Sequence, residues 1–159
     1  MTQNLNILHC NVQGLRTTFI DILEIVYDIN PDIISLQETM HKDTNNNLNT
    51  EIKNYKKIKY NRKTKKEGGL QTYIHNKLDI QSITKTTSEK ENESITITMK
   101  TNNNTLITHV NHYNNKSINI DTDQLKQSFT NKNTILTGDL NCKHHMWGSK
   151  IVNEGGKKT

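Results

Sequence analysis

The alternation of hydrophobic and polar positions over residues 1–40 predicts a strand, a helix and a second strand. Residues 5–10 are expected to form a short strand, and apolar residues recur at helical spacing between positions 18 and 29. The dipeptide Asn30-Pro31 should end this helix, because a residue that precedes proline is pushed out of the α region. Residues 32–37 then form a mostly apolar run that is typical of a buried strand. Both predicted strands end in polar residues.

The remaining segments predict more strands, polar loops and one short helix. Strands are expected over residues 55–60, 70–74, 78–83, 94–99, 105–112 and 134–137, with a hairpin turn at 101–104. Residues 121–130 are expected to form a short helix capped by Asp121 or Thr122. Loops are predicted over 41–54 and 61–67, and a charged surface connection over 84–92. Since no internal repeat and no linker is found, we expect one α+β domain over residues 1–159 and no second domain.

The composition adds few constraints. Hydrophobic residues make up 31% of the chain, and its formal net charge is +5. A positive charge suits a polyanionic partner such as DNA, but a mild excess also occurs in proteins that bind no nucleic acid. Cys10 and Cys142 show no metal-binding spacing, which predicts free buried thiols in a reducing compartment. Because no apolar run of about 18 residues and no signal segment is found, an intracellular protein without membrane contact is expected.

Three short apolar strands carry amide or carboxylate side chains at their C-terminal ends. The first ends at Asn11, the second at Gln37 and Glu38, and the third continues into Gly138-Asp139-Leu140-Asn141. If these strands lie side by side, their oxygen atoms converge on one rim, where they would suit a hard cation such as Mg2+. Such a site could assist phosphodiester hydrolysis. The alternative is that these residues only cap strands in turns, and the spacing alone favours that simpler interpretation.

Longer segments around these residues carry a family resemblance. Motifs of the endonuclease/exonuclease/phosphatase family resemble, in this order, residues 11–16 (NVQGLR), 30–39 (NPDIISLQET) and 138–141 (GDLN). Residues 138–149 have the sequence GDLNCKHHMWGS, which is similar to the GDFNAKHxxWGS stretch of non-LTR retrotransposon endonucleases. Gly68-Gly69 followed by Tyr73-Ile74 resembles the glycine pair and strand of that branch. The resemblance covers nearly the whole chain.

The resemblance implies a fold and a set of site residues. The fold would be a four-layer α/β sandwich of two packed β-sheets with flanking helices, here incomplete at the C-terminus. Glu38 would be the principal ligand of a Mg2+ or Mn2+ ion, and Asn11 would help to hold the ion and its waters. Asp139 would orient or deprotonate the attacking water. Asn141 would hold either the scissile phosphate or the side chain of Asp139.

Two positions depart from the family pattern. Tyr113 falls where the family has an active-site tyrosine, whose hydroxyl would hydrogen-bond a phosphate oxygen. A proline usually follows soon after that tyrosine, whereas Asn114 and Asn115 follow here, so a tyrosine that only packs its ring is the alternative. Gln13 stands where DNA-repair relatives have Asp, a position that often varies in the retrotransposon branch.

A basic run between positions 56 and 66 is a candidate contact to the phosphate backbone of DNA. The residues expected to bind substrate in this run are Arg62, Lys63 and Lys65. A solvated surface loop is an equally weighted alternative for the same segment.

The loop after residue 141 contributes a further candidate. His144 is expected to contact the substrate phosphate or to have a structural role. Zinc binding is disfavoured for His144 and His145, since neither has a Cys or His partner at ligand spacing. Trp147 is expected to anchor the loop by packing.

The family's Ser-Asp-His motif, with a histidine central to hydrolysis, does not occur in these 159 residues. We therefore expect a fragment with weak or no activity alone. The implied function is metal-dependent nicking of duplex DNA in the nucleus, to prime reverse transcription of a transposable element. The RNA of the transposable element would be a further partner, bound by a downstream reverse transcriptase that is not part of these 159 residues. The alternatives are an AP-endonuclease-like repair phosphodiesterase, against which Gln13 and Trp147-Gly148-Ser149 argue, and a decayed, non-catalytic nucleic-acid-binding remnant.

Overall fold

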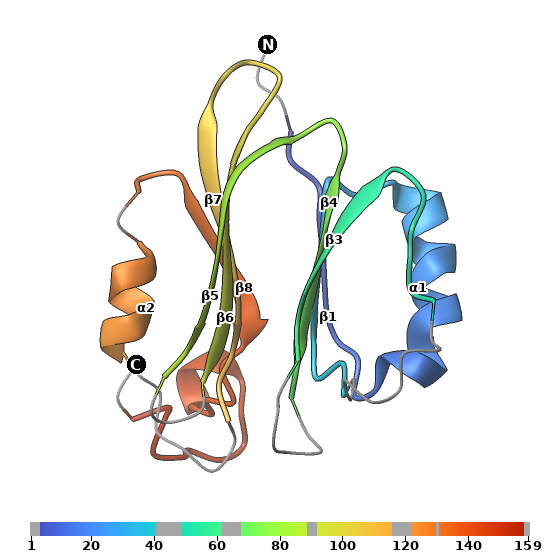
Figure 1. The fold of residues 1–159 in the computed structure, drawn as a ribbon. Helices are drawn as coiled ribbons and strands as arrows, with labels where there is room; N and C mark the ends of the chain where they lie inside the picture. The colour runs from blue at the N-terminus through green and yellow to red at the C-terminus, as the bar shows by residue number, and fades with distance from the viewer. Residues whose placement is uncertain are drawn as a thin grey trace.

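The computed structural model describes residues 4–40, 49–61, 68–88, 92–115, 122–129 and 131–157. Two four-stranded β-sheets pack face to face, with α1 on the outer side of one sheet and α2 on the outer side of the other (Figure 1). The elements in chain order are β1 (Ile7–Asn11), α1 (Leu15–Ile29), β2 (Ile33–Gln37), β3 (Tyr55–Tyr60), β4 (Leu70–His75), β5 (Asp79–Thr87), β6 (Glu93–Lys100), β7 (Leu106–Tyr113), α2 (Thr122–Ser128), β8 (Thr134–Asp139) and the 3-10 turn η1 (His145–Trp147). These four layers confirm the predicted sandwich.

The first sheet has the strand order β1-β2-β4-β3. β1 and β2 run parallel, and the α1 crossover between them supplies the long connection that parallel neighbours need. Their register places Asn11 beside Gln37, so the polar ends of both strands reach the same edge. β4 runs antiparallel to both β2 and β3.

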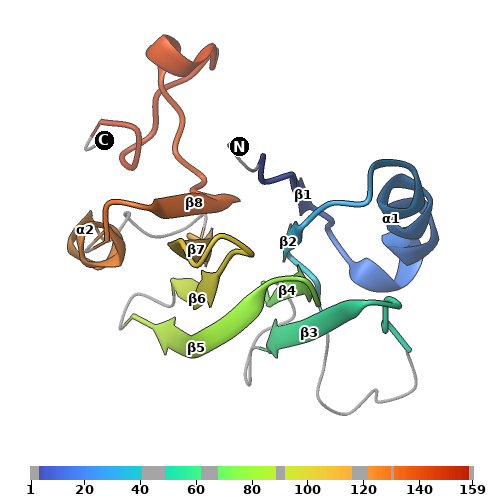
Figure 2. The same ribbon diagram turned by 90° about the horizontal axis from the view of Figure 1, so that it is seen from above.

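The second sheet has the strand order β5-β6-β7-β8. β5, β6 and β7 form an antiparallel meander, and β8 returns parallel to β7 after the segment that contains α2. The register of β7 and β8 places Tyr113 beside Asp139. Viewed from above, the two sheets lie against each other with β1 and β8 at neighbouring edges (Figure 2).

Helix α1 covers the outer face of the first sheet with one apolar stripe. Leu15, Phe19, Ile22 and Val26 are buried in a cluster with the outward side chains of β2. The helix begins at Leu15 rather than near residue 18 as predicted. Thr17 and Thr18 fit into its first turn because both hydroxyls donate to the carbonyl oxygen of Gly14. The helix ends where predicted, with Asn30 in the left-handed conformation.

The space between the sheets is filled by an apolar cluster and a buried polar layer. The apolar cluster consists of Ile33, Ile58, Leu70, Ile74, Leu78, Ile95, Ile97, Met99 and Tyr113. In the polar layer, Gln37 Nε2 donates to Asn111 Oδ1 at 2.7 Å, joining the two sheets. Thr137 Oγ1 hydrogen-bonds both Ser35 Oγ at 2.6 Å and His109 Nε2 at 2.9 Å. Buried polar groups of this kind are tolerated because they find partners.

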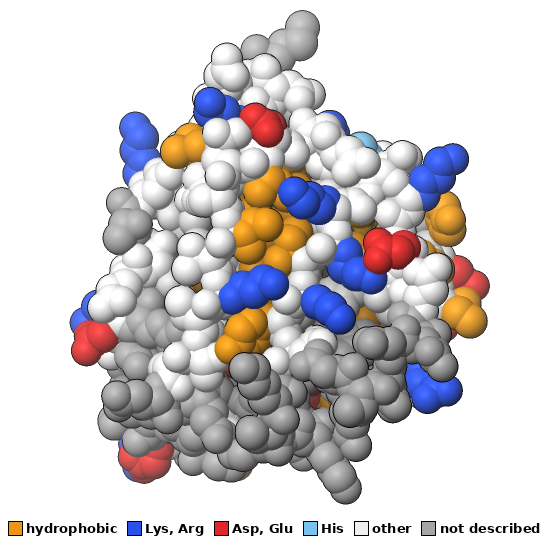
Figure 3. Space-filling view, in the orientation of Figure 1, with side chains coloured by type: hydrophobic (Ala, Val, Ile, Leu, Met, Phe, Trp, Pro, Cys, Tyr) orange, Lys and Arg blue, Asp and Glu red, His pale blue; other side chains and the backbone are white. Residues whose placement is uncertain are grey.

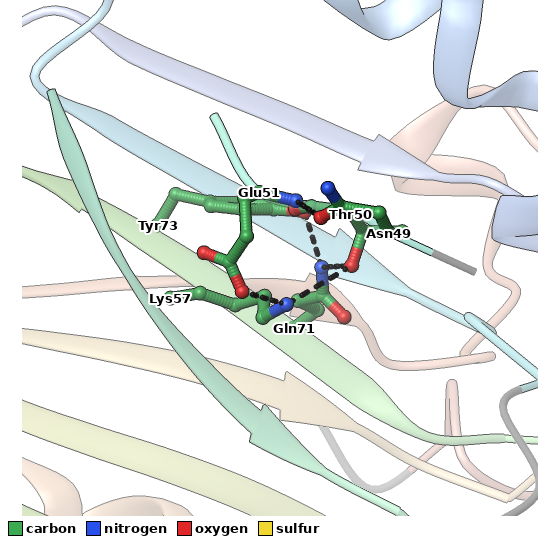
Figure 4. Close-up of polar contacts among 6 residues, drawn as sticks. All are labelled: Asn49, Thr50, Glu51, Lys57, Gln71 and Tyr73. Atoms are coloured by element: carbon green, nitrogen blue, oxygen red, sulfur yellow. Dashed lines mark hydrogen bonds and ion pairs between the residues drawn. The ribbon is translucent and has the colours of Figure 1, made fainter. Parts of the chain in front are cut away.

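A second polar cluster fixes residues 49–52 against the outer face of β3 and β4 (Figure 4). Tyr73 donates from its hydroxyl to the carbonyl oxygen of Thr50 at 2.7 Å. Gln71 Nε2 donates to Thr50 Oγ1 at 3.3 Å, and Lys57 forms an ion pair with Glu51. Burial raises the pKa of the Tyr73 hydroxyl to about 12, so this group keeps its proton even in mildly alkaline solution.

Two local expectations are wrong. β5 continues to Thr87, whereas residues 84–87 were expected in a surface connection. These residues pair with β6, but their side chains are exposed. The sequence therefore shows no alternation of apolar and polar residues there that would have predicted a strand. The cysteines are free as expected but not buried, since Cys10 is exposed on the edge strand β1 and Cys142 is partly exposed. Among the described residues, no helix has the length and apolar character to cross a membrane.

Candidate active site

Several of the predicted site residues lie where strands of both sheets end. Asn11 at the end of β1 donates from Nδ2 to Oδ2 of Asp139 at the end of β8, at 2.6 Å. These residues are 128 positions apart in the sequence, and this hydrogen bond joins the rims of the two sheets. Glu38 follows Gln37, the register partner of Asn11, and Tyr113 is the register partner of Asp139. Four of the predicted residues therefore lie at or next to one rim.

Both carboxylate oxygens of Asp139 have a hydrogen-bond donor. Oδ2 accepts from Asn11, and Oδ1 accepts from the backbone N–H of Asn141 at 2.9 Å. The second contact is a local turn closed by an aspartate side chain. The carboxylate is partly exposed, so it is held in one orientation while remaining accessible to a water molecule.

Glu38 lies in a sharply turned and well-supported segment. Its side chain is 2% exposed, and its φ of 52° lies in the left-handed region. Gly14 N–H donates to the carbonyl oxygen of Glu38 at 2.8 Å, and Thr39 N–H donates to that of Gly69 at 3.2 Å. These contacts from two neighbouring segments hold an unfavourable backbone conformation, which is common at functional sites.

Asn141 contacts the side chain of Asp139, one of the two contacts expected, but through its backbone. Its backbone N–H, not its side chain, bonds Asp139, while its Nδ2 donates to the carbonyl oxygen of Asn114 at 2.7 Å. Asn114 also donates two hydrogen bonds to the end of β8 and the residue after it. Its backbone N–H donates to the carbonyl oxygen of Asp139, and its Nδ2 donates to the carbonyl oxygen of Leu140. A proline at position 114 would lack the N–H that bonds Asp139, and a proline at position 115 would lack the N–H that donates to Asn92 Oδ1 at 3.2 Å.

Tyr113 is 1% exposed, and its ring belongs to the apolar cluster between the sheets. The packing role that was kept as an alternative is therefore present in the fold. A contact between its hydroxyl and substrate remains a prediction.

The segment after β8 extends beyond the edge of its sheet (Figure 2). His144 Nδ1 accepts from Met146 N–H at 3.2 Å and so caps the η1 turn. Its ring lies against Trp147 with 5.7 Å between centroids. Trp147 is 54% exposed, so the expectation that it anchors the loop by packing is wrong.

Asn153 fixes this segment, and no sequence motif pointed to it. Its Oδ1 accepts from the N–H groups of Lys143 and Gly156, both at 2.9 Å. Its Nδ2 donates to the carbonyl oxygen of Asn141 at 2.7 Å, which links the loop to the site. The remaining predicted substrate contacts, Arg62, Lys63 and Lys65, lie outside the described residues.

The donor atoms at this rim fit a hard cation. They are the carboxylates of Glu38 and Asp139 and the amide of Asn11, whose Oδ1 accepts a long hydrogen bond from Gln13 N–H, at 3.3 Å. Within the part of the chain that the structure describes, no three His, Cys, Asp or Glu residues lie close enough to hold a metal. A set of few oxygen ligands suits Mg2+, which binds through one or two carboxylates and keeps several waters, and does not suit zinc.

Two mixed sheets packed face to face between outer helices, with acidic and amide side chains at one rim, define a four-layer α/β-sandwich domain. Residues 5–159 match the model of the Endonuclease/Exonuclease/phosphatase family, and the chain belongs to this family. Members of the family include nucleases and other phosphodiester hydrolases. No curated protein matches the chain significantly.

Solved structures share the fold at low sequence identity. TDP2 of D. rerio, in complex with a single-strand DNA product, has a TM-score of 0.65 and 15% identity, over 92% of this chain and 66% of that one. The catalytic domain of human nocturnin has a TM-score of 0.64 and 16% identity, over 87% and 64%. The AP endonuclease LMAP of Leishmania major has a TM-score of 0.63 and 17% identity, over 87% and 55%. The chain thus spans about two thirds or less of these structures.

Proposed function

We propose that this domain is a divalent-metal-dependent endonuclease that cleaves phosphodiester bonds of duplex DNA. The observation that carries the proposal is the hydrogen bond between Asn11 and Asp139 across the two sheets. It places the amide of Asn11 in the first sheet against the held carboxylate of Asp139 in the second sheet. Family membership supports hydrolysis of a phosphodiester bond as the reaction.

Each site residue has a role in the proposed reaction. Asp139, held by two donors, orients the attacking water and accepts its proton. Glu38 and Asn11 would hold Mg2+ or Mn2+. A bound cation would stabilise the charge that develops on the phosphate oxygens. The hydroxyl of Tyr113 would donate to a phosphate oxygen, and Asn141 supports Asp139 through its backbone N–H.

The biological context that we propose is target-primed reverse transcription of a non-LTR retrotransposon, with the domain acting in the nucleus. The similarity of residues 138–149 to the retrotransposon branch supports it. His144 and the basic run with Arg62, Lys63 and Lys65 would contact the DNA backbone. Cleavage by residues 1–159 alone should be weak, because the sequence contains no Ser-Asp-His motif.

A plasmid-nicking assay tests the proposal. The chain is incubated with supercoiled DNA over a range of Mg2+ concentrations, beside Asp139→Ala, Glu38→Gln and the control Glu24→Gln, an exposed acid on α1. We expect slow nicking that falls by about 100-fold or more in Asp139→Ala, since a general base contributes on that order. Glu38→Gln should raise the Mg2+ concentration that is needed, and Glu24→Gln should behave like the unmodified chain.

Two other results would contradict the proposal. Nicking that is unaffected by Asp139→Ala and Glu38→Gln would show that the rim is not the active site. Salt-sensitive DNA binding that is indifferent to Mg2+ and to Glu38→Gln, without nicking, would instead support a non-catalytic remnant.

The structural likeness to an AP endonuclease supports a second candidate, a DNA-repair phosphodiesterase. Comparing a duplex that contains one abasic site with an intact AT-rich duplex separates the two. Preference for the abasic duplex would favour repair, whereas equal or greater cleavage of the intact duplex would favour the retrotransposon branch.

A further inference from the structure

A buried acid that is not among the predicted site residues lies at the same end of the second sheet. Glu93 is the first residue of β6 and is 0% exposed. Its register partner on β7 is Tyr113, which in turn is paired with Asp139 on β8. Side chains two residues apart in a strand share a face, and Ile95 belongs to the cluster between the sheets. Glu93 therefore points toward the first sheet, at the rim that holds the candidate site.

The carboxylate of Glu93 binds the backbone of the opposite sheet. Gly69, just before β4, donates its N–H to Oε2 of Glu93 at 3.0 Å. This contact is buried and joins residues 24 positions apart. Oε2 of Glu93 is thus the acceptor that fixes the N–H of Gly69.

Gly68 and Gly69 in turn fix the two residues that follow Glu38. Gly69 accepts from Thr39 N–H at 3.2 Å, and Gly68 accepts from Met40 N–H at 3.0 Å. Both glycines have a positive φ, at 96° and 86°, which side-chain-bearing residues rarely adopt. A Cβ on Gly69 would also lie 2.8 Å from Thr39 Oγ1, so the two segments approach closely.

The backbone at Glu38 needs such support. Glu38 and Met40 both have a φ of 52°, an unfavourable conformation for residues with a Cβ. If the glycine pair shifted, this turn would relax and the side chain of Glu38 would change its place at the rim. Glu93 of the second sheet thus holds Gly69, and Gly69 holds Thr39, which follows the proposed metal ligand Glu38.

We propose that Glu93 is a positioning residue for the cation site: through the N–H of Gly69 it holds the Gly68-Gly69 turn, and with it the carboxylate of Glu38. This inference rests on the proposed function. Glu93 is not a cation ligand in this scheme. It holds Gly69 through its acceptor oxygen, and a negative charge on its side chain is not required for that contact. A leucine would bury more favourably at this place, because a carboxylate is costly to remove from water.

The test is Mn2+ binding to the full chain, measured by titration calorimetry, for the unmodified protein and four variants. Glu93→Gln keeps an acceptor oxygen at the same reach, whereas Glu93→Asp keeps the charge but shortens the side chain. Glu38→Gln removes the proposed ligand, and Glu24→Gln removes an exposed acid on α1 as a control. Amide hydrogen exchange of Thr39 and Met40 is followed in the same samples.

The expected order of Mn2+ affinity separates positioning from ligation. Glu93→Gln should bind within about threefold of the unmodified chain, and Glu93→Asp should bind about tenfold or more weakly, the size typical of lost outer-shell support. Exchange at Thr39 and Met40 should quicken in Glu93→Asp and not in Glu93→Gln. Glu24→Gln should change neither quantity.

Three results would overturn the inference. Weaker binding by Glu93→Gln than by Glu93→Asp would make Glu93 a charged ligand. Unchanged binding in Glu93→Asp, with a lower melting temperature, would make it a purely structural residue and leave the proposed function intact. Mn2+ binding that is insensitive to Glu38→Gln would instead remove the proposed cation site itself, and the positioning role with it.

Discussion

At the scale of single residues, Gly138 shows how a short motif can carry a packing constraint. It lies in β8 beside His112 of β7. A Cβ built on Gly138 would collide with the backbone carbonyl of His112, and backbone atoms cannot rotate away as a side chain can. The glycine that precedes Asp139 therefore allows β8 to approach β7 closely enough to place the carboxylate at the rim.

Replacing Gly138 with Ala should destabilise the fold by about 3 kcal/mol, at the upper end of the cost of overpacking. Urea unfolding at pH 7 measures this loss. Gly148→Ala is the matched control, because a Cβ there meets open space and only its φ of 76° opposes the substitution. The control should lose about 1 kcal/mol. Equal losses in the two variants would show that the close approach at Gly138 is not the constraint.

At the scale of elements, each of the two sheets has an edge strand with at least one exposed lysine. β3 and β5 are edge strands on the same side of the sandwich, and lysine side chains surround an apolar strip on the face in Figure 3. Lys56 and Lys59 on β3 and Lys85 on β5 are exposed. Lysines on an edge strand disfavour pairing with a strand of another molecule. The basic character of β3 thus has an explanation within the fold, independent of DNA.

The outer face of β4 depends on the hydroxyl of Tyr73, which is fully buried and donates to Thr50. Tyr73→Phe should lower the free energy of unfolding by about 1–2 kcal/mol, because the Thr50 carbonyl loses its buried donor. Tyr27→Phe on α1 is the control, since Tyr27 is 76% exposed and its hydroxyl should contribute little. Chemical denaturation of both variants gives the comparison. A Tyr73→Phe variant as stable as Tyr27→Phe would mean that water replaces the hydroxyl.

At the scale of the whole molecule, the polar layer between the sheets makes stability depend on pH. Burial, and then the neighbouring His9, lowers the pKa of His109 to about 4. An unfolded histidine titrates near 6.5, so between these values the unfolded chain binds one more proton than the folded chain. His109 therefore costs no stability above about pH 6.5, and stability is lost progressively as the pH falls toward 4.

The free energy of unfolding should fall by about 3 kcal/mol between pH 6.5 and pH 4. This value follows because the unfolded chain binds one more proton than the folded chain over the whole interval between the two pKa values. Unfolding free energies of the unmodified chain and of His109→Gln, measured across this range, should converge as the pH falls. His145→Gln, which alters an exposed histidine, should run parallel to the unmodified chain. Parallel curves for His109→Gln would mean that His109 has the same pKa in the folded and the unfolded chain, and that burial does not lower it.

The sequence by itself determined most of the elements and the strand ends that carry the site. Periodicity of apolar residues is a local property, and so the strands and α1 could be located from it. The motif residues Asn11, Glu38 and Asp139 could be named because each directly follows or ends an apolar strand. The α/β sandwich followed from the family resemblance of the same segments, and the family model and the fold confirm it.

Only the tertiary structure decided which groups support those residues. Glu93 and Asn153 act on segments brought to them by sheet packing and by loop closure, and neither lies in a motif. The last residues of β5 form a strand through their partner β6 although their side chains face water. The exposure of Trp147 likewise depends on where its loop leaves the sheet. Hydrogen bonds between residues far apart in the chain leave no periodic signal, because their spacing is set by the fold and not by the repeat of a helix or a strand.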